Sequence, residues 1–157
     1  SWLIERYPKT VVGIKDSSGK VENMLAMVEE FPEFAVLSGS ESAFLPVLQA
    51  GGAGCITAVS NIVSRLAQRV YSSWIEDGEA DKKAWHVLNA IRKIITRYPL
   101  VAALKAVMAQ HSCDPTWENI RPPLMRLNDN ERVALFASFE TINIRCRYAS
   151  HGVNCCK

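Results

Sequence analysis

Apolar and polar residues alternate in blocks along the first half of the chain, and these blocks predict strands and helices in turn. Continuous apolar runs, rich in β-branched residues, predict buried strands of a parallel sheet at Thr10–Ile14, Phe34–Leu37 and Gly54–Val59. Apolar residues at helical spacing predict helices at Glu22–Phe31, at Glu41–Ala50, and from Asn61 or Ser64 to Glu76. This order of elements predicts βα units on a parallel sheet.

The pattern changes after residue 78. Helical spacing continues without an intervening strand pattern at Glu79–Arg97, Leu100–Gln110 and Asp129–Phe139. We therefore predict three βα units in residues 1–78, a helical region in residues 79–141 and an unassigned tail in residues 142–157. Three parallel strands are too few to close a barrel and leave two open sheet edges. We therefore expect the complete domain to contain further strands that precede this sequence.

An incomplete sheet would leave apolar side chains uncovered. We expect the side chains of Val12, Ile14, Val36 and Ile56 to face the inside of the barrel and to meet water in this chain alone. We also expect Ser1–Arg6 to be the end of a helix that begins before this sequence.

Composition and charge narrow the class of protein. Hydrophobic residues make up 48% of the 157 residues and charged residues 22%, which favours a folded core over disorder. The net charge of +2 gives no electrostatic argument for nucleic acid or for an anionic membrane as partner. The 5 cysteines include no CxxC pair, and Cys55 lies in an apolar run, so we predict a reduced protein of the cytoplasm.

Lys15 is the first candidate for chemistry. It follows an apolar strand at the carboxyl end, where parallel α/β folds assemble their active sites. A lysine amine in that position can attack the carbonyl carbon of a substrate. The alternative is a lysine at a strand end that only extends its ammonium group into solvent.

Polar residues that follow the next two strands are weaker candidates. Gly39-Ser-Glu-Ser42 is expected to face the same side as Lys15, although the pattern alone favours Ser40 as a helix cap. Thr57, Ser60 and Asn61 allow the same two interpretations. Gly51-Gly-Ala-Gly54 precedes a strand, which is the reverse of the order in a dinucleotide-binding loop, and we predict only a turn there. His86 and His111 lie in helical segments, and His111-x-Cys113 is only a weak metal pattern for which an ordinary structural role is favoured, so we predict neither metal nor cofactor.

Several of these segments resemble one enzyme family. Val11-Val-Gly-Ile-Lys-Asp-Ser-Ser-Gly19 resembles the Schiff-base lysine motif of the dihydrodipicolinate synthase / N-acetylneuraminate lyase family. Three further segments follow in the family's order: Leu37–Ser42, Gly51–Asn61 and the C-terminal stretch from Pro99 to Leu124. The similarity extends from Tyr7 to Phe139 and implies the C-terminal part of a (β/α)8 TIM barrel, with strands six to eight and a C-terminal helical extension.

The resemblance also implies an activity and a set of site residues. Family members form or cleave a carbon–carbon bond to pyruvate through a lysine imine, and they are usually tetramers. Lys15 would form the imine on the sixth strand. Gly39 and Glu41 match positions that contact the polar end of the substrate, and Ile56 matches a residue that lines the pyruvate site. The implied partners are pyruvate and an aldehyde.

Departures from the family leave the substrate open. The sequence lacks the first five strands, and with them the carboxylate-binding loop and a proton-relaying tyrosine. We therefore expect residues 1–157 alone to be inactive. Ala58 stands where sialic acid lyases have a serine. The Asp16–Gly19 loop is closer to family members that act on 2-keto-3-deoxy sugar acids and to synthase-like members without an assigned substrate. The first hypothesis is a 4-hydroxy-tetrahydrodipicolinate synthase type of enzyme, and the second is a 2-keto-3-deoxy sugar acid aldolase. A third, of another class, is a non-catalytic remnant that folds only with a partner, or a regulatory relative that binds a 2-oxo acid without turnover.

Overall fold

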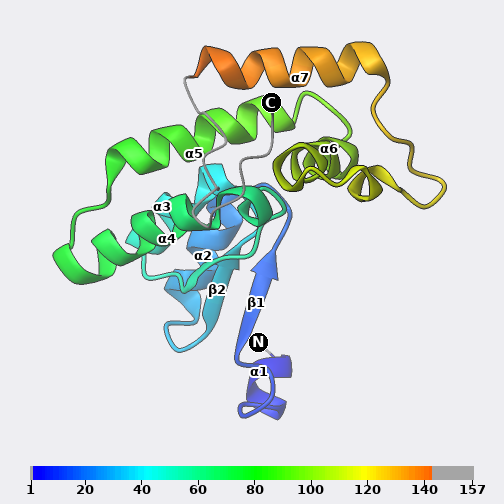
Figure 1. The fold of residues 1–157 in the computed structure, drawn as a ribbon. Helices are drawn as coiled ribbons and strands as arrows, with labels where there is room; N and C mark the ends of the chain where they lie inside the picture. Colours follow the sequence, from blue (N-terminus) through cyan, green and yellow to red (C-terminus); the bar gives the residue numbers. More distant parts are fainter. Residues whose placement is uncertain (1, 143–157) are drawn as a thin grey trace. The chain divides into compact units, whose positions relative to one another are not determined.

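Parallel strands and helices alternate in the computed structural model, which describes residues 2–142 (Figure 1). The strands β1 (Gly13–Asp16), β2 (Ala35–Ser38) and β3 (Gly54–Cys55) form a parallel sheet in the order β1-β2-β3. Each strand is followed by a helix, and these helices are α2 (Val21–Glu30), α3 (Glu41–Gln49) and α4 (Ser60–Asp77). The predicted alternation of strands and helices is confirmed. A short helix, α1 (Trp2–Arg6), precedes β1.

Two of the strands are displaced from, or shorter than, the apolar runs that predicted them. The first run begins at Thr10, but the amides of Thr10 and Val11 both donate to the carbonyl of Tyr7, at 3.0 and 2.8 Å, and this turn delays the strand. The third run extends to Val59, but the chain leaves the sheet after Cys55. Thr57 Oγ1 then accepts a hydrogen bond from the amide of Ser60 at 3.2 Å, which starts α4.

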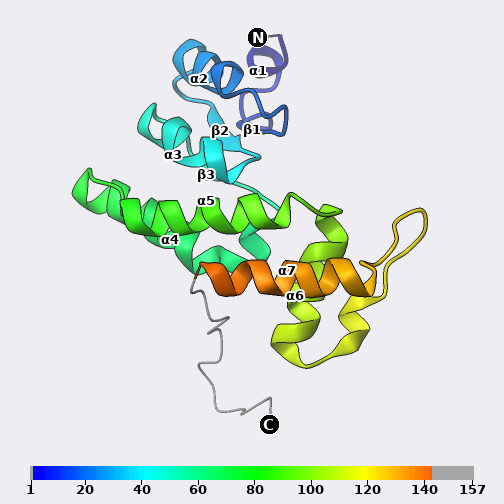
Figure 2. The same cartoon turned by 90° about the horizontal axis from the view of Figure 1, so that it is seen from above.

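The helices α2 and α3 cover one face of the sheet and form a core with it. Met24, Ala43 and Val47 from these helices pack with Val36 of β2, and all four side chains are buried. The prediction that Val36 faces the inside of a barrel and meets water is therefore wrong. Ile14 is the register partner of Val36, so both belong to the helix-facing side of the sheet. Figure 2 shows α2 and α3 following one another along the sheet.

Apolar side chains are exposed on or beside the two outer strands, β1 and β3. Val12 is 59% exposed, Ile14 40% and Ile56 53%. Val12 and Ile14 lie on or beside the edge strand β1, where the described chain supplies no further strand or helix to cover them. The expected exposure of these three side chains is confirmed, but the prediction that Ile14 faces the inside of the barrel is wrong, because Ile14 lies on the helix-facing side of the sheet.

The described chain forms two compact units that divide within α5 (Lys82–Ile95), between Asn89 and Ala90. The second unit also contains α6 (Leu100–Ser112), a 3₁₀ turn (Pro115–Glu118) and α7 (Asp129–Thr141). The helix α7 starts with a capping box in which Asn128 and Glu131 each accept from the other's amide, both at 2.9 Å. The predicted tail lies outside the described residues, apart from Ile142 at its start.

Candidate active site

The strand register brings three of the four predicted site residues to the carboxyl ends of the strands. Lys15 pairs with Leu37, and Leu37 pairs with Gly54, so these residues form one row across the three strands. One residue further on, Asp16, Ser38 and Cys55 form the next row. Gly39 and Ile56 follow directly, and their amides donate to the carbonyls of Asp16 and Ser38 at 2.7 and 2.9 Å. The carboxyl ends of the strands therefore gather Lys15, Gly39 and Ile56.

Lys15 is exposed and lies on the face of the sheet opposite to α2 and α3. Its neighbours along β1 alternate with it, so that Asp16 is buried on the helix side while Lys15 remains accessible. Ile56 has the same alternation relative to Cys55 and is also exposed. The open face at the strand ends thus carries an exposed amine on β1 and an exposed apolar side chain after β3.

Asp16 is a buried carboxylate that the sequence interpretation did not select. Its Oδ1 accepts a hydrogen bond from the amide of Ser18 at 2.6 Å, and its Oδ2 accepts one from Asn23 Nδ2 at 2.7 Å. The hydrogen bonds from Ser18 hold the pKa of Asp16 below its ordinary value. The signal was present in the sequence, because Asp followed by Ser-Ser-Gly is a turn composition in which the side chain binds the backbone two residues later.

Gly39 permits a close approach between the ends of β1 and β2. A Cβ atom at this position would lie 2.4 Å from the carbonyl oxygen of Asp16 and 2.9 Å from the Cα atom of Ser17. Both neighbours are backbone atoms and cannot rotate away. The glycine is therefore required by the chain itself, independently of any ligand.

The serines after β2 form local hydrogen bonds. Ser38 is fully buried, and its Oγ donates to the carbonyl of Ser40 at 2.8 Å and accepts from the amide of Ser40 at 3.2 Å. Ser40 occupies the position before α3, but its hydroxyl contacts Ser42 Oγ at 2.9 Å and makes no capping bond. The predicted position of Ser40 at the helix start is confirmed, whereas the predicted capping bond is absent.

Glu41 is set apart from the other predicted site residues by its burial. It is the first residue of α3 and is 2% exposed, whereas Lys15 and Ile56 lie open to solvent. The carboxylate lies near Cys55. Burial, followed by the charge of Glu41, raises the pKa of the Cys55 thiol to about 11, while a hydrogen bond with Ser60 opposes this rise. The thiol is therefore protonated at neutral pH.

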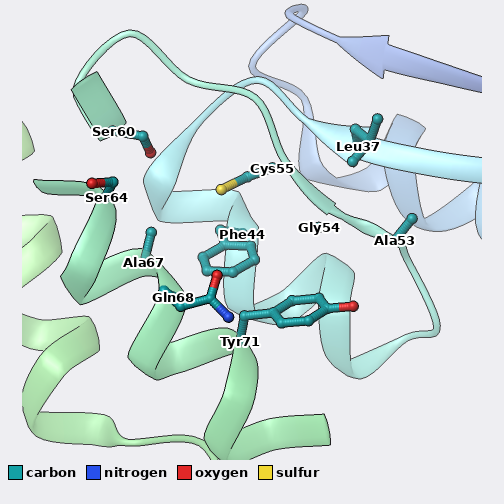
Figure 3. Close-up of a pocket in the computed structure, with 10 residues that line it drawn as sticks. All are labelled: Leu37, Phe44, Ala53, Gly54, Cys55, Ser60, Ser64, Ala67, Gln68 and Tyr71. Atoms are coloured by element: carbon teal, nitrogen blue, oxygen red, sulfur yellow. The ribbon is translucent and has the colours of Figure 1, made fainter.

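A pocket of about 320 Å³ lies between the strands β2 and β3 and the helices α3 and α4 (Figure 3). Its wall is mostly apolar, with Phe44 and Ala67 beside the polar groups of Cys55, Gln68 and Tyr71. None of the four predicted site residues lines it. The pocket nevertheless borders the row that carries Lys15, because Leu37 and Gly54 of that row line it.

The described residues 2–142 contain no group of three or more His, Cys, Asp or Glu side chains that could hold a metal ion. Within the same range, no helix combines the length and the apolar character that crossing a membrane requires. The strand ends carry an amine, hydroxyl groups and carboxylates.

Known proteins have sequences similar to this one. The profile of the Dihydrodipicolinate synthetase family matches residues 3–142. An uncharacterized DapA-like lyase of Chloroflexus aurantiacus is 32% identical over 140 residues, which cover 89% of this chain and 46% of that protein. A 4-hydroxy-tetrahydrodipicolinate synthase of Listeria welshimeri is 33% identical over 138 residues, covering 85% of this chain and 45% of the synthase. The chain thus spans about half the length of the curated relatives it matches.

Solved structures share the fold. A prophage protein of the dihydrodipicolinic acid synthase family from E. coli K12, solved in complex with pyruvate, matches with a TM-score of 0.75 and 22% identity over 86% of this chain and 47% of that one. A Sulfolobus 2-keto-3-deoxygluconate aldolase matches with a TM-score of 0.74 and 18% identity over 89% of this chain and 48% of the aldolase. The α/β fold is that of the C-terminal part of a TIM barrel, as predicted. With a profile match over residues 3–142, the chain belongs to the dihydrodipicolinate synthetase family, whose members are lyases.

Proposed function

We propose that this chain carries the imine-forming lysine of an enzyme that makes or breaks a carbon–carbon bond to pyruvate, in the manner of a 4-hydroxy-tetrahydrodipicolinate synthase. The observation that carries the proposal is the position of Lys15, which is exposed at the carboxyl end of a parallel strand in a member of a lyase family. In (β/α)8 enzymes that end of the strands supplies the catalytic residues.

The reaction follows from the chemistry of a lysine amine. The neutral Nζ of Lys15 attacks the carbonyl carbon of pyruvate, the adduct takes up one proton from solvent, the carbonyl oxygen leaves as water, and a protonated imine remains. The iminium nitrogen accepts the electron pair that develops when the adjacent methyl carbon loses a proton. That carbon then forms the new bond to an aldehyde, and hydrolysis of the imine releases the product and restores the amine. The reverse sequence cleaves the bond.

The neighbouring residues have separate roles in this proposal. Ile56 supplies an exposed apolar surface beside the methyl carbon of pyruvate. Gly39 has no side chain, so its backbone approaches the substrate closely. Glu41 influences the choice of the second substrate. Because Glu41 is buried here, direct contact with that substrate requires the residues around the start of α3 to move.

Two candidate activities use the same lysine imine and differ in their substrate. The first candidate is the aldehyde used by 4-hydroxy-tetrahydrodipicolinate synthases, the activity named for the Listeria relative at 33% identity. A 2-keto-3-deoxy sugar acid is the alternative, and the Asp16–Gly19 loop favours it. We further propose a homotetramer in the cytoplasm as the working form of the complete protein.

Borohydride trapping tests the role of Lys15. The complete gene product that contains this chain is incubated with pyruvate and reduced, and the modified peptide is identified by mass spectrometry. We expect the reduced pyruvate adduct on Lys15, and we expect Lys15→Ala to abolish both adduct and turnover. Lys9→Ala is the matched control, because Lys9 is an exposed lysine outside the strand, and both functions should persist.

The outcomes separate the hypotheses. An adduct on Lys9 or Lys20 in place of Lys15 would show that the imine assignment is wrong. An adduct on Lys15 without turnover of either candidate substrate would favour the non-catalytic protein that binds a 2-oxo acid.

A further inference from the structure

The buried carboxylate of Asp16 lies directly beside Lys15 in the sequence but on the opposite face of β1. We propose that Asp16 is a positioning residue for Lys15: by joining the end of β1 to the following loop, to α2 and to β2, it holds the lysine backbone in place for attack on the carbonyl carbon. This inference rests on the proposed function of Lys15 and adds a residue that never touches the substrate.

Three connections meet at Asp16. The first runs from Oδ1 to the amide of Ser18 and closes the loop after the strand, at 2.6 Å. The second runs from Oδ2 to Asn23 Nδ2 on α2, at 2.7 Å. The third uses the backbone, because the carbonyl of Asp16 accepts from the amide of Gly39 at 2.7 Å. One residue thus links four successive segments of the fold.

The carboxylate acts at the point where β1 passes into the following loop, one residue after Lys15. Its two side-chain hydrogen bonds fix this junction to the loop and to α2. The carboxylate is also the stronger acceptor for this purpose, since charged acceptors form shorter and stronger hydrogen bonds than neutral ones.

The restraint matters for catalysis because attack on a carbonyl requires a defined approach of the amine. A displacement of about 1 Å at a reacting group lowers rates by as much as ~100-fold. Without the carboxylate, the loop from Ser17 to Lys20 loses its closing bond and α2 loses its tie to the strand. The side chain of Lys15 then starts from a less defined backbone position.

The experiment measures the rate of imine formation with pyruvate in the complete gene product, by quenching with borohydride at timed intervals and quantifying the Lys15 adduct. We expect Asp16→Ala to slow adduct formation about tenfold or more, with the final extent of labelling at saturating pyruvate preserved. All rates are measured well below the unfolding temperature of each variant, so that loss of folded protein does not enter the comparison.

The control is a second aspartate with the same local geometry. Asp114 Oδ1 accepts from the amide and the hydroxyl of Thr116 at 2.9 and 2.6 Å, in a turn of the other compact unit. Asp114→Ala removes a comparable turn and should leave the rate at Lys15 unchanged. A general loss of stability would slow both variants, whereas positioning slows only the variant at Asp16.

A paired exchange keeps the test decisive if Asp16→Ala does not fold. Asp16→Asn with Asn23→Asp restores one carboxylate and one amide to the same contact, while Asn23→Ala removes one bond from an exposed helix position. We expect the exchange to retain most of the rate and Asn23→Ala to lower it a few fold. Wild-type rates in Asp16→Ala, or equally in Asn23→Ala should the first not fold, would overturn the positioning role. Absence of any Lys15 adduct in the wild type would overturn the proposed function instead.

Discussion

Replacement of Gly39 by alanine tests whether the ends of β1 and β2 must approach each other as closely as the structure shows. The new methyl group would lie 2.4 Å from the Asp16 carbonyl oxygen and 2.9 Å from Ser17 Cα, and either the strands separate or the backbone bends. Overpacking of this kind costs about 1–3 kcal/mol, and weakening the Gly39–Asp16 hydrogen bond adds about 1 kcal/mol. We therefore expect Gly39→Ala to lower the free energy of unfolding by roughly 2–4 kcal/mol.

The measurement is equilibrium unfolding in urea, followed by circular dichroism, with Gly78→Ala as the control. Gly78 ends α4 with φ of +67°, and a methyl group there meets no atom within 4 Å. This control therefore carries only the cost of a left-handed alanine, roughly 1–2 kcal/mol. If Gly39→Ala were no more destabilising than Gly78→Ala, the strand ends would be free to separate and the steric argument would be refuted.

Four further predictions concern charge, accessibility and the chain in isolation. Glu41→Ala should lower kcat/KM for the complete substrate pair while borohydride trapping of pyruvate persists, and equal loss of both would contradict a role in substrate choice. Because the pKa of Asp16 is lower in the folded state than its ordinary value of 3.8, its carboxylate stabilises the fold above pH 3.8, and this stabilisation is lost as the pH falls through the folded pKa. The difference in unfolding free energy between wild type and Asp16→Asn should accordingly shrink below pH 3.8, and a constant difference would count against the assignment. With its pKa raised to about 11, the Cys55 thiol should resist alkylation at pH 8, by peptide mapping, while the exposed Cys113 reacts, and equal labelling would show that Cys55 is accessible as thiolate. Residues 1–157 expressed alone should show no turnover and should associate with one another through the open strand edges, and a monodisperse, active monomer in size-exclusion chromatography would refute this.

The carboxyl end of β1 shows how much of the site is local information. The apolar run before Lys15 and the Asp-Ser-Ser-Gly segment after it are sufficient to predict a strand, a turn and a lysine at their junction, because strand burial and turn conformation depend on nearby residues. The same local patterns predicted α2, α3 and α4 and the change to helices alone after residue 78. Together with the family motifs, they were sufficient for the fold class.

Residues that act across strands required the tertiary structure. The register that places Lys15 beside Leu37 and Gly54 depends on how three segments pair, and each segment by itself is compatible with other pairings. The apolar character of Val36 could not decide which face it occupies, and packing against Met24 and Val47 determined that it faces the helices. The residues around an acidic side chain in the sequence do not indicate whether its carboxylate is buried in the fold.

Asp16 and Glu41 both show that the burial of a carboxylate could not be predicted from the sequence. Both are acidic residues that follow a predicted strand, and the resemblance to the family selected only Glu41 as a site residue. In the fold, Asp16 is held by an amide of its own loop and a side chain of α2, whereas Glu41 is enclosed at the start of α3 near Cys55. Sequence therefore determined which chemical groups are present and which local turns they favour, and only the assembled helices and strands determined which of those groups remain open to a substrate, because burial depends on residues that are distant in the chain.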